Sequence, residues 1–457
     1  MNIYFVGIGG IGMSALARHF NSLGERVAGY DRTPTRLTQE IEAEGIKITF
    51  DDNTDEIPET FRDKANTTVV FTPAIPAENK ILTYFRQNGF NIVKRAEMLG
   101  RLTADANAIC IAGTHGKTTT STLTAHILRN SKVGCSAFLG GISANYDTNY
   151  WRNEQSQFIV TEADEFDRSF LHLHPYLALI TSMDADHLDI YGTHKEVIKA
   201  FHKFASQTAV GGSLVYKYGL NFDESKVGED SEIFTYAREN DKADFYAFGI
   251  KLVGSRYHFS ISTPFGQITD VELGLPGLHN VENAVAATAL AMLAGAEEDE
   301  VRAALKTFIG NRRRFQYRID TENFCMIDDY AHHPEEIRTM LSSVKAMYKG
   351  RRITVVFQPH LYTRTRDFAD GFAAALSIAD RILLLDIYPA REQPIPGVDS
   401  NMLAAKMKGA DVKLTTKEAL FDEIMSEPLD VLVMMGAGNI DAMVPDIEGR
   451  IRKVLKL

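Results

Sequence analysis

A lysine and two threonines follow a short glycine-rich turn about a quarter of the way along the chain. The segment comes directly after an apolar run that is typical of a buried strand, and it reads Gly113-Thr114-His115-Gly116-Lys117-Thr118-Thr119. Backbone N–H groups of such a loop wrap phosphate oxygens, the lysine supplies a cation to the terminal phosphates, and a threonine hydroxyl can join Mg²⁺. The strict motif has a glycine at position 111, where this chain has Ile111. The segment therefore predicts a shortened phosphate loop for ATP or a similar nucleotide, rather than a helix cap alone.

Two acidic segments follow other short apolar runs, and each offers ligands for a cation. Residues 161–167 read Thr-Glu-Ala-Asp-Glu-Phe-Asp, and residues 184–189 read Asp-Ala-Asp-His-Leu-Asp. Mg²⁺ prefers hard oxygen ligands and often takes only one or two from a protein. Glu162, nearest the strand end, is thus a candidate ligand, and His187 is a candidate for a second divalent ion or a phosphate oxygen. The alternatives are a solvated acidic loop and a surface or capping histidine.

A second glycine-rich turn lies near the start of the chain, between a predicted strand and a predicted helix. It reads Gly7-Ile8-Gly9-Gly10-Ile11-Gly12. These glycines permit a tight turn and the close approach of a diphosphate to the helix N-terminus. Asp31 follows Gly12 by 19 residues, at the end of the next strand, where it could bind a ribose hydroxyl. By itself the pattern favours NAD, and the alternative is a turn that only packs helix against strand.

Polar residues also gather at four other places where predicted elements end. These clusters are residues 279–283, 312–314, 328–334 and 358–366. Arginines in the second and fourth clusters could clamp an anion, and the third and fourth clusters each follow a strand. The last third of the chain therefore presents polar groups at the carboxyl ends of its strands. Asn280 could instead be a helix N-cap, and the arginines could form a solvated linker.

Short β-type runs alternate with helical patterns, which is typical of parallel sheets covered by helices. Helices are expected over 13–23 and 280–293, and an antiparallel extension is expected within 213–272. We predict an α/β chain with three domains, at residues 1–103, 104–311 and 312–457. The predicted strands are 3–6, 26–30, 68–71, 91–93, 108–112, 158–161, 177–181, 324–327, 353–357, 382–385 and 431–435.

The bulk composition is that of an ordinary globular protein. The chain has 457 residues, which suggests about three domains, and its formal net charge of −11 argues against a generally basic surface for nucleic acid. Its three widely spaced cysteines form neither a metal pattern nor a disulfide framework, which fits a reducing compartment. No apolar run approaches the ~18 residues of a membrane span, and the N-terminus lacks the features of a signal peptide. A cytoplasmic protein is expected.

In this order, the motifs resemble those of the Mur ligase family. The resemblance runs from residue 3 to about residue 440, and the shortened phosphate loop is part of the family pattern. It implies a Rossmann-like N-terminal domain, a central P-loop ATPase-type domain with a mainly parallel sheet, and a Rossmann-like C-terminal domain that closes over the site. The matching segments are GIGGIGMSALA, AGTHGKTTT, EADEFD, ADHLD, LPGLHNVENA, RRRF, DDYAHHP, FQPHLYTRTRD and GAGNI.

The resemblance also implies an ATP-dependent enzyme that forms an amide bond during peptidoglycan precursor synthesis. Within the family, the motifs most resemble those of members that join L-alanine to the muramate carboxylate of UDP-N-acetylmuramate. The carboxylate attacks the γ-phosphate of ATP to give an acyl phosphate, L-alanine attacks the carbonyl, and phosphate leaves. The implied cofactors are ATP and Mg²⁺. The implied partners are the two small substrates, without nucleic acid or membrane, and the chain is expected to be a monomer or a weak homodimer.

Roles are carried over from the family one residue at a time. The resemblance implies a nucleotide site of Gly113, Thr114, His115, Gly116, Lys117, Thr118, Thr119, Asn280, Arg314 and Asp329. It implies metal ligands Thr118 and Glu162, with His187 at a second metal. It implies catalytic roles for Lys117, His187, Asn283 and Arg314. It implies substrate contacts from Gly9, Gly10, Gly12 and Asp31 to UDP, not NAD, and from Tyr330, His360 and Arg364 to the amino acid and muramate.

Two departures and three alternatives accompany this interpretation. Several family members have arginine where this chain has Leu361, so that anion contact is not carried over. Sister ligases use a carbamylated lysine at the second metal, but neither Lys199 nor Lys203 aligns securely with it. The alternatives are a sister ligase that adds a whole peptide during cell-wall recycling, an NAD-dependent dehydrogenase, and a non-catalytic nucleotide switch.

Overall fold

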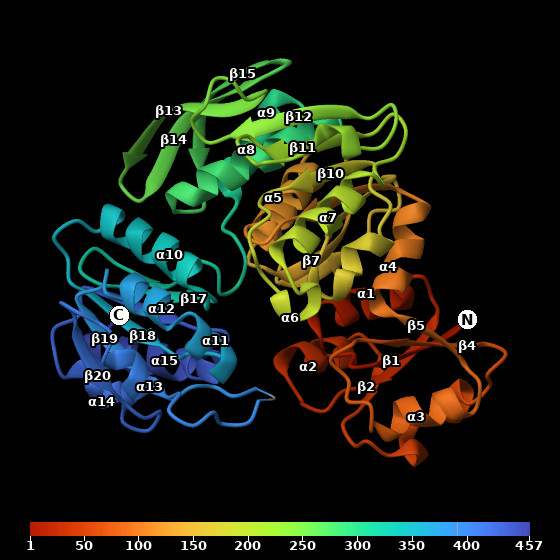
Figure 1. Cartoon of the computed structure of the whole chain (residues 1–457), viewed down its shortest axis with the longest axis horizontal. Helices are drawn as coiled ribbons and strands as arrows, with labels where there is room; N and C mark the ends of the chain where they lie inside the picture. The colour runs from red at the N-terminus through yellow and green to blue at the C-terminus, as the bar shows by residue number, and fades with distance from the viewer. Residues whose placement is uncertain (391) are drawn as a thin grey trace. The chain divides into compact units, whose positions relative to one another are not determined.

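The structure, a computed structural model, describes residues 1–390 and 392–457, without the side chains of Leu188 and Asp189. The backbone divides into two compact units. The first unit comprises Met1–Ile250, His258–Leu273 and Val281–Phe308, and the second comprises Lys251–Tyr257, Gly274–Asn280 and Ile309–Leu457. Sheets covered by helices build both units, as the alternating sequence pattern predicts (Figure 1).

The first sheet has five strands in the order β3-β2-β1-β4-β5, all parallel. Helices α1 and α2 contribute to the core on one face, and α3 packs on the other. Because β1 lies between β2 and β4, the glycine turn after β1 leaves the sheet where the strand order reverses, which is where doubly wound sheets bind ligands. The elements are β1 (Asn2–Val6), α1 (Ile11–Ser22), β2 (Arg26–Tyr30), α2 (Arg36–Ala43), β3 (Lys47–Thr49), β4 (Thr67–Phe71), α3 (Lys80–Gln87), β5 (Asn91–Lys94) and α4 (Arg95–Ala104).

The central sheet has ten strands in the order β15-β14-β13-β12-β11-β10-β6-β9-β7-β8. Strands β7, β9, β6, β10, β11 and β12 pair in parallel. The strands are β6 (Asn107–Ala112), β7 (Ser136–Ser143), β8 (Thr148–Trp151), β9 (Phe158–Glu162), β10 (Leu177–Ile180), β11 (Ser213–Lys217), β12 (Glu232–Ala237), β13 (Phe245–Val253), β14 (Arg256–Thr263) and β15 (Gly266–Leu273). The helices are α5 (Lys117–Arg129), α6 (Leu188–Tyr191), α7 (His194–Ala205), α8 (Leu278–Leu293) and α9 (Glu298–Thr307).

The third sheet has six strands in the order β16-β17-β21-β18-β19-β20, with only β16 antiparallel. Apolar residues of α10, α12 and α13 cover one face, and those of α14 and α15 cover the other. Asp329, Phe357 and Met435 are aligned in register, so three loops leave the same sheet edge. The elements are β16 (Gln316–Asp320), β17 (Cys325–Asp329), α10 (Pro334–Met347), β18 (Ile353–Phe357), α11 (Tyr362–Asp367), α12 (Ala369–Leu376), β19 (Arg381–Leu384), α13 (Ser400–Ala404), β20 (Asp411–Leu414), α14 (Leu420–Met425), β21 (Val431–Met435) and α15 (Val444–Leu455).

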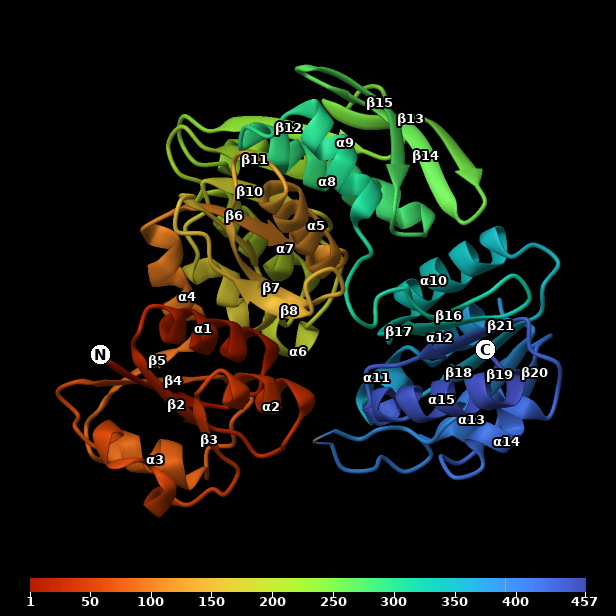
Figure 2. The ribbon, with the colours of Figure 1, turned by 180° about the vertical axis from the view of Figure 1, so that it is seen from behind.

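The predicted strands are confirmed with small shifts at their ends, but the extension over 213–272 is only partly antiparallel. β11 and β12 join the central sheet in parallel. The antiparallel part is confined to β13–β15, whose two-residue connections permit only antiparallel neighbours. The sequence analysis also missed the antiparallel hairpin β7–β8, which packs beside α1 (Figure 2). No helix within the described residues is long and apolar enough to cross a membrane.

Candidate active site

The predicted phosphate loop connects β6 to α5 at the carboxyl edge of the central sheet. Gly113 has φ +135° and Gly116 has φ +82°, which favour glycine. A Cβ on Gly113 would lie 1.9 Å from Thr181 Oγ1, and one on Gly116 would lie 2.9 Å from Asn283 Oδ1. The Thr181 hydroxyl donates to the His115 carbonyl at 2.5 Å. The glycines therefore let the loop lie close to Thr181, directly after β10, and the Thr181 hydroxyl holds the loop there.

The tight approach of Gly113 to Thr181 gives a first prediction. Gly113→Ala is expected to destabilise the protein by about 2–4 kcal/mol, since strain and overpacking add, and to weaken nucleotide binding. Gly24→Ala is the matched control: its φ is +78°, but among the described residues, apart from its two neighbours in the chain, no heavy atom lies within 4 Å of the added Cβ. That control should cost only about 1 kcal/mol. Thermal unfolding and nucleotide titration measure both, and equal losses for the two variants would contradict the prediction.

Lys117, the first residue of α5, lies with its ammonium group among carboxylates. Its Nζ donates to the Gly113 carbonyl at 2.6 Å and lies 3.0 Å and 2.8 Å from the two carboxylate oxygens of Glu165. Burial alone would lower the pKa of Lys117, but the carboxylates of Glu165, Glu162 and Asp164 outweigh burial and raise it to about 12. The lysine is thus a fixed cation at the mouth of the loop.

The acidic segment after β9 supplies two different glutamates to this loop. The hydroxyl of Thr118 donates to Glu162 Oε2 at 2.8 Å, so a hydroxyl and a carboxylate oxygen, both of kinds that can bind a divalent ion, meet beside the loop. Glu165, three residues further on, is only 1% exposed. Glu162 was predicted as a functional residue from the sequence, whereas Glu165 was not. Residues 161–167 contain both glutamates, but nothing in the neighbouring sequence distinguished the roles of the two.

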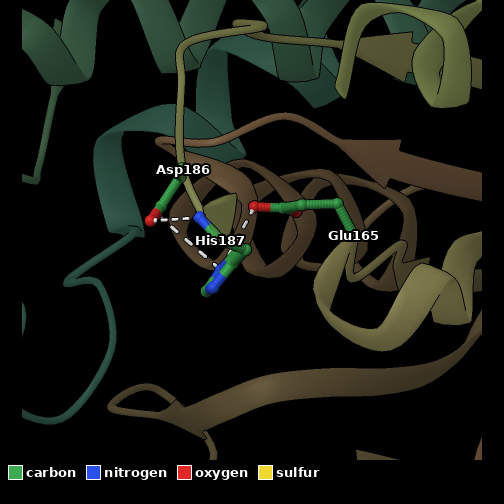
Figure 3. Close-up of side chains that lie close together, drawn as sticks. All are labelled: Glu165, Asp186 and His187. Carbon is green, nitrogen blue, oxygen red and sulfur yellow. Dashed lines mark hydrogen bonds and ion pairs between the residues drawn. The ribbon is translucent and has the colours of Figure 1, made fainter. Parts of the chain in front are cut away.

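A second group of possible metal ligands comprises Glu165, Asp186 and His187 (Figure 3). One ligand atom from each lies within 4.8 Å of the others. His187 Nε2 lies 3.9 Å from Glu165 Oε1 and 3.7 Å from Asp186 Oδ2. His187 adopts a left-handed backbone with φ +51°, and its N–H donates to Asp186 Oδ1 at 2.8 Å. Two carboxylates and one imidazole are a donor set that suits a divalent cation.

Asn280 and Asn283 lie one turn apart on α8. Asn283 Oδ1 accepts a hydrogen bond of 3.3 Å from the hydroxyl of Thr120, which brings it to the phosphate loop. The alternative that Asn280 caps the helix is wrong, because α8 begins at Leu278. Its amide donates instead to the carbonyl of Pro276 at 2.6 Å.

The N-terminal glycine turn is held by the acid that the sequence analysis paired with it. The N–H of Gly9 donates to Asp31 Oδ2 at 2.8 Å, and the N–H of Thr33 donates to Asp31 Oδ1 at 3.1 Å. Gly10 precedes the first turn of α1, and the side chain of Arg95 packs against Gly12. Asp31 therefore orders the turn, and each of its carboxylate oxygens can accept a further hydrogen bond.

In the second unit, Asp329 lies at the carboxyl end of β17 with both oxygens bound to backbone. The N–H of Phe315 donates to one oxygen at 2.7 Å and that of Ala331 to the other at 2.8 Å. Burial raises the pKa of Asp329 to about 6, although Arg314 and these two hydrogen bonds act in the opposite direction. Asp329 thus ties the backbone directly after Tyr330 to the segment that precedes β16, and Arg314 of that segment lies 5.2 Å from the centre of the Tyr330 ring.

The loop after β18 brings His360 and Arg364 together. Arg364 Nη1 lies 3.5 Å from His360 Nδ1, and the His360 ring stacks on Tyr388 with centroids 5.8 Å apart. Leu361, between them, has φ +71°, a strained conformation for a branched residue. Leu361 precedes α11 and offers no side-chain cap to the helix. At the start of α11, the carboxylate of Glu392 accepts a hydrogen bond of 3.0 Å from the N–H of Thr363. The structure thus orders this loop without the arginine found in several family members.

These sheets and the loop around Lys117 define an α/β enzyme of the P-loop nucleotide-binding class. Comparison with known proteins makes this more specific: the chain belongs to the Mur ligase family, whose members form amide bonds at the expense of ATP. The family's catalytic domain matches residues 2–107, its middle domain matches 111–291, and its glutamate ligase domain matches 313–438. The predicted three-domain α/β fold class and the family resemblance are confirmed, and a dehydrogenase is excluded.

Relatives cover nearly the whole chain. A UDP-N-acetylmuramate–L-alanine ligase of Phocaeicola vulgatus is 46% identical over 99% of this chain and 98% of its own length. The enzyme of that name from Porphyromonas gingivalis is 48% identical over 97% of both. The crystal structure of a UDP-N-acetylmuramate-alanine ligase from Thermotoga maritima is 28% identical, with a TM-score of 0.83 over 99% of this chain and 100% of that one. A murein peptide ligase from Psychrobacter arcticus, 23% identical with a TM-score of 0.73 over 98% and 99%, shares the fold.

Proposed function

We propose that this protein joins L-alanine to the muramate carboxylate of UDP-N-acetylmuramate and thereby makes a peptidoglycan precursor. One observation carries the proposal beyond family membership. Full-length relatives at 46–48% identity bear the name of this activity, and a shared activity is expected to need the same phosphate loop. In this chain Lys117, Thr118 and Glu162 are already assembled around that loop.

The first chemical step is transfer of the γ-phosphoryl group of ATP to the muramate carboxylate. The carboxylate oxygen forms a bond to phosphorus, the bond from phosphorus to the β–γ bridging oxygen breaks, and ADP leaves. Phosphoryl transfer needs alignment and charge neutralisation more than covalent help. Lys117 would bind the β- and γ-phosphates, and Thr118 and Glu162 would hold Mg²⁺, which supplies further neutralising charge.

In the second step, the amine of L-alanine attacks the acyl phosphate carbonyl, and inorganic phosphate leaves. The incoming carboxylate of L-alanine requires a cation, and Arg364, adjoining His360, can supply one. Tyr330 would line the pocket that binds L-alanine and the muramate, together with His360 and Arg364. Asn280 and Asn283 would contact adenine and the reacting carboxylate, and Arg314 and Asp329 would bind nucleotide.

The remaining roles in this proposal belong to the UDP moiety and to the second metal. The turn at Gly9, Gly10 and Gly12 would receive the diphosphate at the N-terminus of α1, with Asp31 at the ribose. His187 would hold a second divalent ion. The protein would act in the cytoplasm as a monomer or a weak homodimer.

A phosphate-release assay tests the proposed function. Purified protein with ATP, Mg²⁺ and UDP-N-acetylmuramate is given L-alanine, L-serine, glycine or a free cell-wall tripeptide. We expect phosphate release to require every component and to be fastest with L-alanine, the amino acid named in the activity of the full-length relatives. Release with the tripeptide alone would instead assign the chain to the peptide-adding ligases. ATP binding without release under any condition would indicate a nucleotide switch.

A further inference from the structure

Glu165 is a buried carboxylate to which the proposed reaction gives no role. Its side chain is 2% exposed, and its two oxygens lie 3.0 Å and 2.8 Å from Lys117 Nζ. Its backbone carbonyl accepts a 2.7 Å hydrogen bond from the hydroxyl of Tyr191, which fixes the residue from behind. The lysine that must meet the phosphates of ATP is thus already paired with a carboxylate.

The charge around this pair disfavours a bare nucleotide. Lys117 faces Glu165, and Glu162 and Asp164 lie close enough to raise its pKa as well. Phosphate oxygens arriving at Nζ must compete with Glu165 and approach the other two carboxylates. In a buried site such repulsion is weakly screened. The loop needs an added positive charge before it can accept a triphosphate.

Glu165 also faces the place where such a charge could be held. Its Oε1 atom is within 3.9 Å of His187 Nε2, and Asp186 completes the group (Figure 3). Glu165 therefore lies between two alternative cations: the ammonium of Lys117, and a divalent ion among Glu165, Asp186 and His187. A carboxylate that turns to the ion releases Lys117 for the phosphates.

We propose that Glu165 holds Lys117 in the nucleotide-free protein, so that the phosphate loop accepts a nucleotide only together with a divalent cation. The proposal rests on the proposed function only in placing the nucleotide at Lys117. Glu165 is a positioning residue in this account. It acts through Lys117 and makes metal and nucleotide binding interdependent.

The test is the equilibrium binding of a fluorescent ATP analogue, measured with EDTA and with Mg²⁺ for the wild-type protein and for Glu165→Gln. In EDTA, Glu165→Gln should bind the analogue at least about tenfold more tightly than the wild-type protein. The reason is that the phosphates no longer compete with a carboxylate about 3 Å from the ammonium of Lys117. The factor by which Mg²⁺ tightens binding of the analogue should be smaller in Glu165→Gln than in the wild-type protein by a similar amount. Unchanged or weaker binding in EDTA, with the advantage of Mg²⁺ intact, would overturn the proposal.

The matched control is Asp167→Asn, which removes one charge from the same segment. Asp167 lies 3.0 Å from Lys94 and not at Lys117, so its removal should change binding in EDTA by less than about twofold. Glu165→Asp is the second variant if Glu165→Gln does not fold. The shorter carboxylate should tighten EDTA binding by a smaller factor, and no change would count against the proposal. Failure of the wild-type protein to bind the analogue under either condition would count against the proposed function instead.

Discussion

Lys117→Ala is expected to abolish phosphate release, with a loss of about 10³-fold or more, because the variant lacks the cation that neutralises charge on the transferring phosphoryl group. The effect should be large because Lys117 is held at the loop by the carbonyl of Gly113 and has a fixed position. A fixed charge stabilises developing negative charge without having to reorganise. Phosphate release under saturating substrates measures the effect.

Stability must be followed in the same variant, since Lys117→Ala leaves Glu165 without its cation. A buried unpaired carboxylate destabilises a protein. We therefore expect a lower melting temperature, but the variant should still be folded at low temperature and should unfold cooperatively. The double variant Lys117→Ala/Glu165→Gln should recover melting temperature without recovering turnover. Lys132→Ala is the surface control, because Lys132 pairs with Glu297 in an exposed ion pair. Near-wild-type turnover in Lys117→Ala would refute the assigned role.

Glu162→Gln is expected to lower turnover by about 10²–10³-fold, the range seen when a preorganised electrostatic contact is lost. The carboxylate accepts from the Thr118 hydroxyl at 2.8 Å, and together they present two oxygens to the mouth of the phosphate loop. An amide oxygen keeps the shape of the side chain but lacks the charge that a divalent ion requires. Turnover measured across a range of Mg²⁺ concentrations tests this prediction.

The Mg²⁺ dependence separates a ligand from a merely structural residue. If Glu162 holds the ion, the Mg²⁺ concentration that gives half-maximal turnover should rise by about tenfold or more, because one of few protein ligands is lost. A structural defect would lower the maximum and leave that concentration unchanged. The latter result would remove Glu162 from the metal site.

Prediction from the sequence was most accurate for elements whose pattern lies within a few neighbouring residues. The strands over 26–30, 353–357 and 431–435 occur with the predicted bounds. Buried parallel strands are short apolar runs with turn residues at both ends, so neighbours in sequence suffice to recognise them. The hairpin β7–β8 has no such pattern, since Gly140 and Gly141 interrupt β7, and its position is set by packing against α1.

Ends of elements and choices between like residues were harder to predict. Asn280 has the residue type of an N-cap, but the helix begins two residues earlier, and the amide of Asn280 donates to the carbonyl of Pro276, which precedes the helix. Asp31 was assigned to a ligand, and the structure shows that it also holds the turn at Gly9. In both cases residue type indicated a polar role, while the partner depended on chain geometry.

The phosphate loop shows what the sequence by itself determined and what only the tertiary structure decided. Strand, glycine turn, lysine and threonine are contiguous, so residues 108–119 contain nearly all the information for a phosphate cradle. The partners of Lys117 and Thr118 come from a segment more than 40 residues away. Asp167 and Arg168 turn that segment with left-handed φ values of 52° and 56°. The fold directs Glu162 to Thr118 and Glu165 to Lys117. Which glutamate accepts from which donor depends on where β9 lies beside β6, and that is a property of the folded sheet.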